Sequence, residues 1–92
     1  MMMQGQHWTV EVVIDEHHDD RLTHAEARLQ APRRPAMAGV GRARRNPEDP
    51  DVPRIGDELA VARALSDLAH QLLEVAAGDI EMATREKARL QR

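Results

Sequence analysis

The spacing of the apolar residues changes once along this 92-residue chain, and that change restricts the possible folds more than any other feature. Before residues 46–53, apolar and polar residues alternate in short runs, which is typical of strands that bury one face. From Ile55 onward, apolar residues recur every three or four positions, which is typical of a helix. The segment between the two patterns contains three prolines, so regular strand pairing is excluded there.

Three strands are predicted in the first half of the chain. They cover residues 8–15, 22–29 and 37–45, where side chains alternate between two faces. In the third strand Gly39 and Gly41 lie on one face, and two such glycines indicate either a bulge or a close approach of another backbone. The apolar face of the first strand carries Trp8, Val10, Val12 and Ile14.

The second half is predicted to be a long helix that begins near Ile55. Its apolar residues cover about half of the helix circumference, which is more than the ~100° stripe needed against a single sheet. Asp57 and Glu58 are expected in the first turn. Gly78 is expected to interrupt the helix, and Asp79 to cap a short final helix. The polar side of the long helix is expected to carry Arg63, Asp67, His70, Gln71 and Glu74.

These elements predict an α+β fold, in which a three-stranded antiparallel sheet packs against one long helix and a short C-terminal helix. We expect a single domain over residues 7–86, a disordered N-terminus over 1–6 and a frayed C-terminus over 87–92. With one Trp and no Phe or Tyr, the core is thin, so a second copy is expected to supply part of it. The expected homodimer interface comprises Trp8, Val61, Leu68 and Val75.

Composition argues against several classes of protein. The chain has no cysteine, which excludes a disulfide framework, a thiolate metal site and a cysteine nucleophile. No apolar run approaches the ~20 residues that span a bilayer, and polar residues interrupt the N-terminus where a signal peptide would be apolar. We therefore expect a cytoplasmic protein with no membrane partner. Ser66 and His70 lie one helical turn apart but lack a pocket or oxyanion hole, so no enzymatic activity, cofactor or small-molecule substrate is expected.

Five arginines fall within thirteen residues that contain no acid: Arg33, Arg34, Arg42, Arg44 and Arg45. A guanidinium group binds phosphate through two parallel hydrogen bonds, so this group is a candidate nucleic-acid interface. A solvated strand edge that is protected from pairing by its charge is the simpler explanation of the same residues. The acidic residues 48–51 could also fold back and neutralise the arginines.

Two other features have a purely structural explanation as well as a functional one. Trp8 is the one aromatic residue available to stack on bases, but it shares the apolar strand face, which favours a core or interface position. His17 and His18 lie among acids in the expected hairpin loop 16–20. Neighbouring side chains on a loop rarely converge on one ion, so an exposed turn is expected there and no metal site.

One long stretch resembles a known family. Residues 55–69, with the sequence IGDELAVARALSDLA, resemble the signature of a small actinobacterial family of unknown function. Shorter stretches also fit this family, so the resemblance extends over about residues 8–89: residues 10–16, 18–19, 39–41, 43–44, 46–47 and 79–81. Arg42 and Arg45 stand where the family usually has large apolar residues, and the link 31–35 also departs from its pattern.

The resemblance implies a fold like that of double-stranded-RNA-binding domains and an intimate homodimer. Some members are associated with stress or dormancy, and their fold has been likened to ribosome hibernation promoting factors. The family has no established catalytic or ligand residues, so none is carried over. The leading expectation is a stress-associated factor that contacts the ribosome or structured RNA. The alternative is a protein-interaction adaptor that uses the acidic loop 48–51 or the polar helix face.

Overall fold

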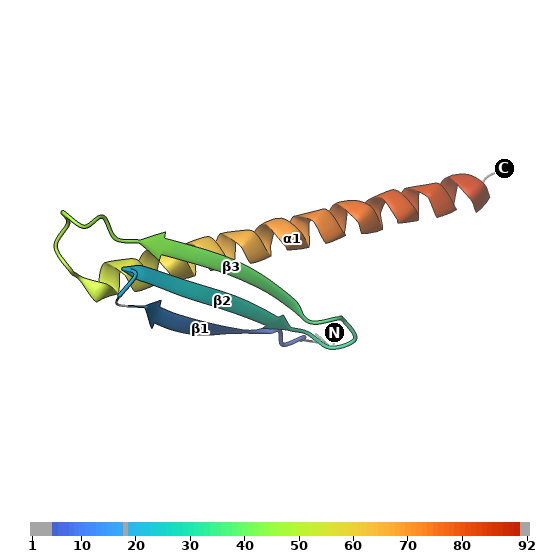
Figure 1. Cartoon of the computed structure of the whole chain (residues 1–92). Coiled ribbons are helices and arrows are strands. Elements are labelled where there is room, and N and C mark those ends of the chain that lie inside the picture. Colours follow the sequence, from blue (N-terminus) through green and yellow to red (C-terminus); the bar gives the residue numbers. More distant parts are fainter. Residues whose placement is uncertain (1–4, 18, 91–92) are drawn as a thin grey trace.

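The computed structural model describes residues 5–17 and 19–90. The strands form one antiparallel sheet in the order β1-β2-β3, and the helix lies across one face of it (Figure 1). The predicted α+β class and three-stranded antiparallel sheet with a long helix are confirmed. The elements are β1 (Thr9–His17), β2 (Leu22–Gln30), β3 (Met37–Arg44) and α1 (Pro53–Leu90).

The strand register shows which side chains face the helix. Ala27 of β2 lies opposite Val12 of β1 and Gly39 of β3, and directly opposite residues in antiparallel strands project from the same face. Ala27 is fully buried, so this row points towards α1. Rows two residues away repeat the pattern, which confirms the predicted alternation in all three strands.

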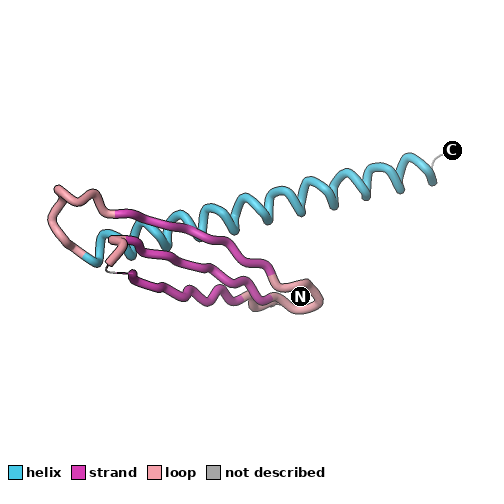
Figure 2. The backbone as a smooth tube through the Cα atoms, viewed as in Figure 1, coloured by secondary structure: helices cyan, strands magenta, loops and turns pink. Residues whose placement is uncertain are grey.

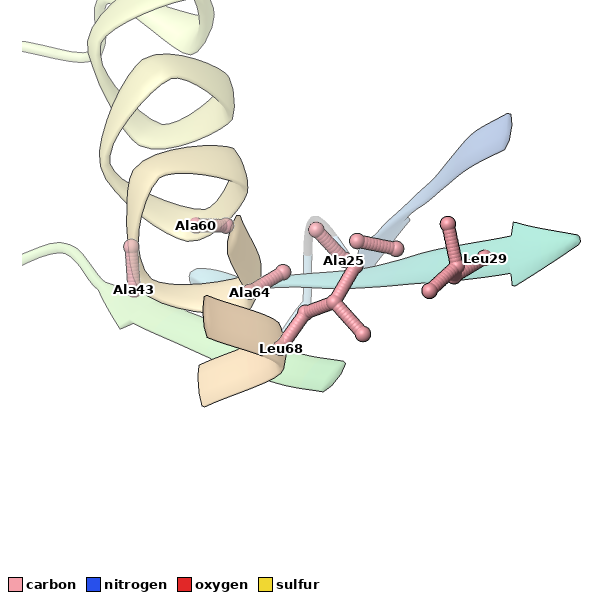
Figure 3. Packing of buried hydrophobic residues seen from close by; sticks show 7 residues of the cluster. Ala25, Leu29, Ala43, Ala60, Ala64 and Leu68 are labelled. Carbon is pink, nitrogen blue, oxygen red and sulfur yellow. The ribbon is translucent and has the colours of Figure 1, made fainter. Parts of the chain in front are cut away.

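The core consists mostly of small residues. Figure 3 shows alanines of α1 stacked over alanines of the sheet, with a leucine at the far end of the cluster. A Cβ atom placed on Gly39 would lie 2.3 Å from the backbone oxygen of Ala64, and one placed on Gly41 would lie 2.2 Å from that of Ala60. The helix therefore rests directly on the backbone of β3, which is the close approach that the glycines predicted. The core residues are Ala25, Ala27, Leu29, Ala43, Ala60, Ala64 and Leu68.

The helix begins earlier than expected, at Pro53. Proline suits the first position of a helix because its fixed φ angle matches the helix and the missing N–H would have no helical partner there. As a consequence, Asp57 and Glu58 lie about one turn inside the helix, and the first turn contains no acid. Their expected position in the first turn was wrong.

The expected break at Gly78 is also wrong, because α1 continues without interruption to Leu90. An exposed glycine weakens a helix by about 1 kcal/mol relative to alanine, and this is too little to stop a long helix. Beyond Gly78, Arg85 pairs with Glu81 at 2.6 Å. There is consequently no separate short helix within residues 79–90. Residues 1–4 and 91–92, parts of the expected terminal segments, lie outside the described residues.

About half of α1 extends past the sheet (Figures 1 and 2). Gln71, the nineteenth of the 38 helical residues, is hydrogen-bonded to Ala38 beside the start of β3. The next 19 residues continue at ~1.5 Å per residue and form what we call the overhang, residues 72–90. Large apolar side chains are exposed there, with Leu73 at 69% and Ile80 at 66%.

Candidate interaction surface

A ladder of polar side chains from α1 binds the outer edge of β3. Arg63 donates to the backbone oxygen of Arg42 at 2.7 Å. Asp67 accepts from the backbone N–H of Val40 at 2.8 Å. Gln71 donates to the backbone oxygen of Ala38 at 2.8 Å and also contacts Asp67 at 3.3 Å.

The match between the two elements follows from their geometry. Four helical residues rise ~6.0 Å, and two strand residues rise ~6.6 Å, so every fourth helical residue meets every second strand residue. Outward-facing groups of an edge strand need hydrogen-bond partners or water. The helix supplies a donor, an acceptor and a donor in turn, which closes this edge to pairing with another chain.

The helical spacing predicts these three residues on the solvent side of the helix, so their role at the edge of β3 was missed. The available signal was the spacing of Arg63, Asp67 and Gln71 at four-residue intervals with alternating hydrogen-bond character. To recognise this spacing as a signal, one would have to know that α1 runs antiparallel to β3 along the outer edge of that strand.

Because α1 lies over β2 and β3, part of the apolar surface has no cover within the chain. The apolar side chains of β1 face the helix side of the sheet but stay 36–45% exposed. The flank of α1 turned away from the β3 edge is also apolar, and Leu65 on it is 42% exposed. We refer to the following residues, of which Val61 and Leu72 are half-buried at the border of the core, as the uncovered apolar surface: Val10, Val12, Ile14, Val61, Leu65 and Leu72.

The residues expected at a dimer interface fall in different environments. Leu68 is 4% exposed and belongs to the chain's own core, so it is not available to a partner. Val61 is half-buried at the border of that core. Trp8 remains exposed just before the start of β1, where the guanidinium carbon of Arg34 lies 4.7 Å from the centre of its ring. Val75 is exposed near the start of the overhang.

The structure does not bring the five arginines into one patch. Arg33 and Arg34 lie in the turn between β2 and β3, and Arg33 has a φ of 63°. Arg42 and Arg44 project from the sheet face opposite the helix, since they alternate with buried Gly41 and Ala43. Given ~3.3 Å per strand residue, roughly 25 Å of strand separates the two groups.

The loop that follows β3 binds the side chain of Arg45. Its guanidinium donates to the backbone oxygen of Asp49 at 2.9 Å and lies 3.6 Å from the carboxylate of Asp51. The prediction that the acidic loop folds back on an arginine is therefore confirmed for Arg45. The loop also borders a pocket of about 340 Å³ between the ends of the strands and the start of α1, with Arg44 and Leu22 in its wall.

The sheet face opposite the helix, which we call the polar face, is divided by charge. Across one row, Asp15 of β1 lies opposite His24 of β2 and Arg42 of β3. Arg28 of β2 pairs with Glu26, and this contact, together with the more distant carboxylates of β1, raises the pKa of Arg28. Acids thus lie along β1 and cations along β3.

Other candidate chemistry is sparse in the described residues. Within residues 5–17 and 19–90, no three histidine or acidic side chains are grouped to hold a metal ion, and His18 lies outside this part. His70 pairs with Glu74 at 3.1 Å, one turn further along the helix from Ser66. In the same described part, no helix has the long apolar stretch that membrane crossing requires.

Comparison with known proteins shows which family is similar to this chain. Residues 6–89 match the model of the Rv2632c-like family. The chain belongs to this family. The uncharacterized protein MT1780 of Mycobacterium tuberculosis (strain CDC 1551 / Oshkosh) is 56% identical over 85 residues, which cover 92% of this chain and 87% of the relative. The uncharacterized protein Rv2632c of Mycobacterium tuberculosis (strain ATCC 25618 / H37Rv) is 50% identical over 82 residues, covering 89% and 85%.

The crystal structure of Rv2632c superposes on the present one with a TM-score of 0.81 and 49% identity, over 91% of this chain and 96% of that chain. The Rv2632c-like fold is therefore shared across nearly the whole molecule. Membership in a small actinobacterial family without an assigned function is confirmed. The implied likeness to RNA-binding domains and hibernation factors stays a prediction.

Proposed function

We propose that this Rv2632c-like protein acts as a homodimer that binds a partner and catalyses no reaction. The observation that carries the proposal is the uncovered apolar surface. A core built mainly from alanine supplies little burial, and covering further apolar area stabilises a chain by about 25 cal/mol per Å². A second copy offers the same surface, so a two-fold pair covers both at once.

Structured RNA, including ribosomal RNA, is the partner that we propose for the dimer. Arg42 and Arg44 point to solvent from alternate positions of β3, and in the described part of the chain neither guanidinium forms an ion pair. Recognition of folded RNA by its shape needs cations at the backbone and no aromatic platform, which suits a chain with one Trp. The family resemblance adds a stress- or dormancy-related setting to the proposal, and the composition adds a cytoplasmic location.

RNA binding can be measured with a labelled RNA duplex of about 20 base pairs by fluorescence anisotropy at low salt. We expect Arg42→Ala/Arg44→Ala to bind at least tenfold more weakly than the parent, which corresponds to ~1.4 kcal/mol. The matched control Arg54→Ala/Arg85→Ala removes the same charge from the exposed helix surface and is expected to bind within about twofold of the parent. Equal losses in the two variants, or no binding by the parent, would favour the protein-interaction adaptor.

A further inference from the structure

We propose that the overhang of one chain lies antiparallel to α1 of a second chain and covers that chain's uncovered apolar surface, in a reciprocal arrangement. This inference rests on the proposed homodimer and specifies which segment of the partner fills the surface. Three observations support it: the lengths of the two halves of α1, the apolar residues on one flank of the helix, and the charges at its two ends.

The lengths agree. The half of α1 that lies on its own sheet, residues 53–71, has 19 residues, and so has the overhang. Each half is ~28 Å long, and β1, with nine residues, is ~30 Å long. A two-fold axis near Gln71 and Leu72 would therefore place each overhang along the full length of the partner's β1 and of the helix half beside it.

The apolar flank is continuous across both halves. At ~100° per residue, Leu65 on the sheet-bound half shares a side of the helix with Leu72, Ala76 and Ala83 on the overhang. Ala76 and Ala83 are exposed in the single chain. The same flank of the sheet-bound half carries a shallow hollow bordered by Glu58, Val61 and Leu65. Small residues facing a hollow allow two helices to approach within the usual 8–10 Å.

The charges at the two ends are opposite. Residues 53–58 carry Arg54, Asp57 and Glu58, a net charge of −1, whereas residues 86–89 carry Glu86, Lys87 and Arg89, a net charge of +1. An antiparallel pair brings each acidic end to the partner's basic end, while a parallel pair would place like charges together. One carboxylate oxygen of Asp57 is buried without a hydrogen-bond partner among the described residues, at the place where the basic end of the partner would arrive.

Cysteine cross-linking tests this arrangement cleanly, because the chain has no natural cysteine. Val61 and Ala83 are ~33 Å apart along one helix, so a disulfide between them cannot form within a chain. Under mild oxidation we expect full-length Val61→Cys/Ala83→Cys to form a covalent dimer, and each single variant to stay uncross-linked. The control Ser66→Cys/Ala77→Cys has the same antiparallel offset on the outward face of α1 and is expected not to cross-link.

The outcomes separate this inference from the dimer itself. If the double variant keeps a dimeric mass but does not cross-link, or if a single variant cross-links, the antiparallel arrangement is overturned and the homodimer stands. A monomeric parent overturns both. A second measurement uses charge reversal: Glu58→Lys and Lys87→Glu are each expected to raise the dimer dissociation constant several-fold, and the combined variant to restore it. Failure of the combined variant to restore the constant would count against the inferred contact.

Discussion

The carboxylate of Asp67 accepts a hydrogen bond from the backbone N–H of Val40 at 2.8 Å and thereby ties the middle of α1 to the outer edge of β3. This contact lies at the centre of the ladder formed with Arg63 and Gln71. The ladder fixes the lateral position of the helix. With α1 held over β3, the apolar side of β1 is left partly exposed, and the proposed homodimer rests on this placement.

Removing the carboxylate of Asp67 should show how much its hydrogen bond to Val40 contributes to the free energy of unfolding. We expect Asp67→Ala to lower the free energy of unfolding by about 1–2 kcal/mol, because a hydrogen bond to a charged group is lost and water replaces it only in part. Asp67→Asn keeps an acceptor oxygen and should recover most of the loss. Equilibrium unfolding in urea gives both values. Glu74→Ala, which removes an exposed acid paired with His70, is the control; an equal loss there would refute a special role for Asp67.

Glycine substitutions should act in opposite directions along the chain. Gly39→Ala and Gly41→Ala would each push a Cβ atom against the helix backbone, and we expect losses of about 3 kcal/mol. Gly78→Ala meets nothing within 4 Å and should stabilise the helix by about 1 kcal/mol. Thermal unfolding of the three variants measures these changes. If Gly39→Ala proved as stable as the parent, the close packing of α1 on β3 would be wrong.

The strands and the long helix could be predicted because their evidence is local. Alternation from Trp8 to Ile14 and the three-to-four spacing after Ile55 each follow from the geometry of a single element. The Gly39 and Gly41 pair even indicated a close backbone approach before any partner element was known. The continuation of this helix past Gly78 was missed because Gly78 was given more weight as a breaker than its ~1 kcal/mol cost justifies.

The interaction surfaces were harder to predict because they depend on how elements lie beside one another. Leu68 and Val61 looked alike on the helix, yet Leu68 is buried in the core and Val61 lies at its border. The arginines looked like one cluster because they are close in sequence, but Arg34 and Arg44 lie at opposite ends of the sheet region. Only the register shows that Arg42 lies in the same row as Asp15.

Charge placed on the apolar side of β1 should separate self-association from folding. Val12 points towards the helix side but is 36% exposed, so Val12→Lys should leave each chain folded. At the proposed interface the lysine would have to be buried, and we expect the dimer dissociation constant to rise at least tenfold. Sedimentation velocity measures the change. Thr9→Lys is the control on the same strand, and an equal effect there would show that position on the apolar side is irrelevant.

Salt dependence should reveal how many phosphates the dimer contacts. With Arg42 and Arg44 from each of two chains, about four phosphates would be neutralised, and the slope of log K against log salt concentration should be about −3.6. Arg42→Ala/Arg44→Ala should bring that slope close to zero. Anisotropy titrations at several salt concentrations provide the slopes. A parent slope near zero would mean that RNA, if bound at all, is not held through these arginines.

The mass of the protein in solution tests the central proposal most directly. Sedimentation equilibrium of the full chain should be recorded from micromolar to millimolar concentration. We expect a species of twice the 10.4 kDa chain mass, which persists on dilution into the low micromolar range. A folded species of 10.4 kDa at every concentration would contradict the homodimer.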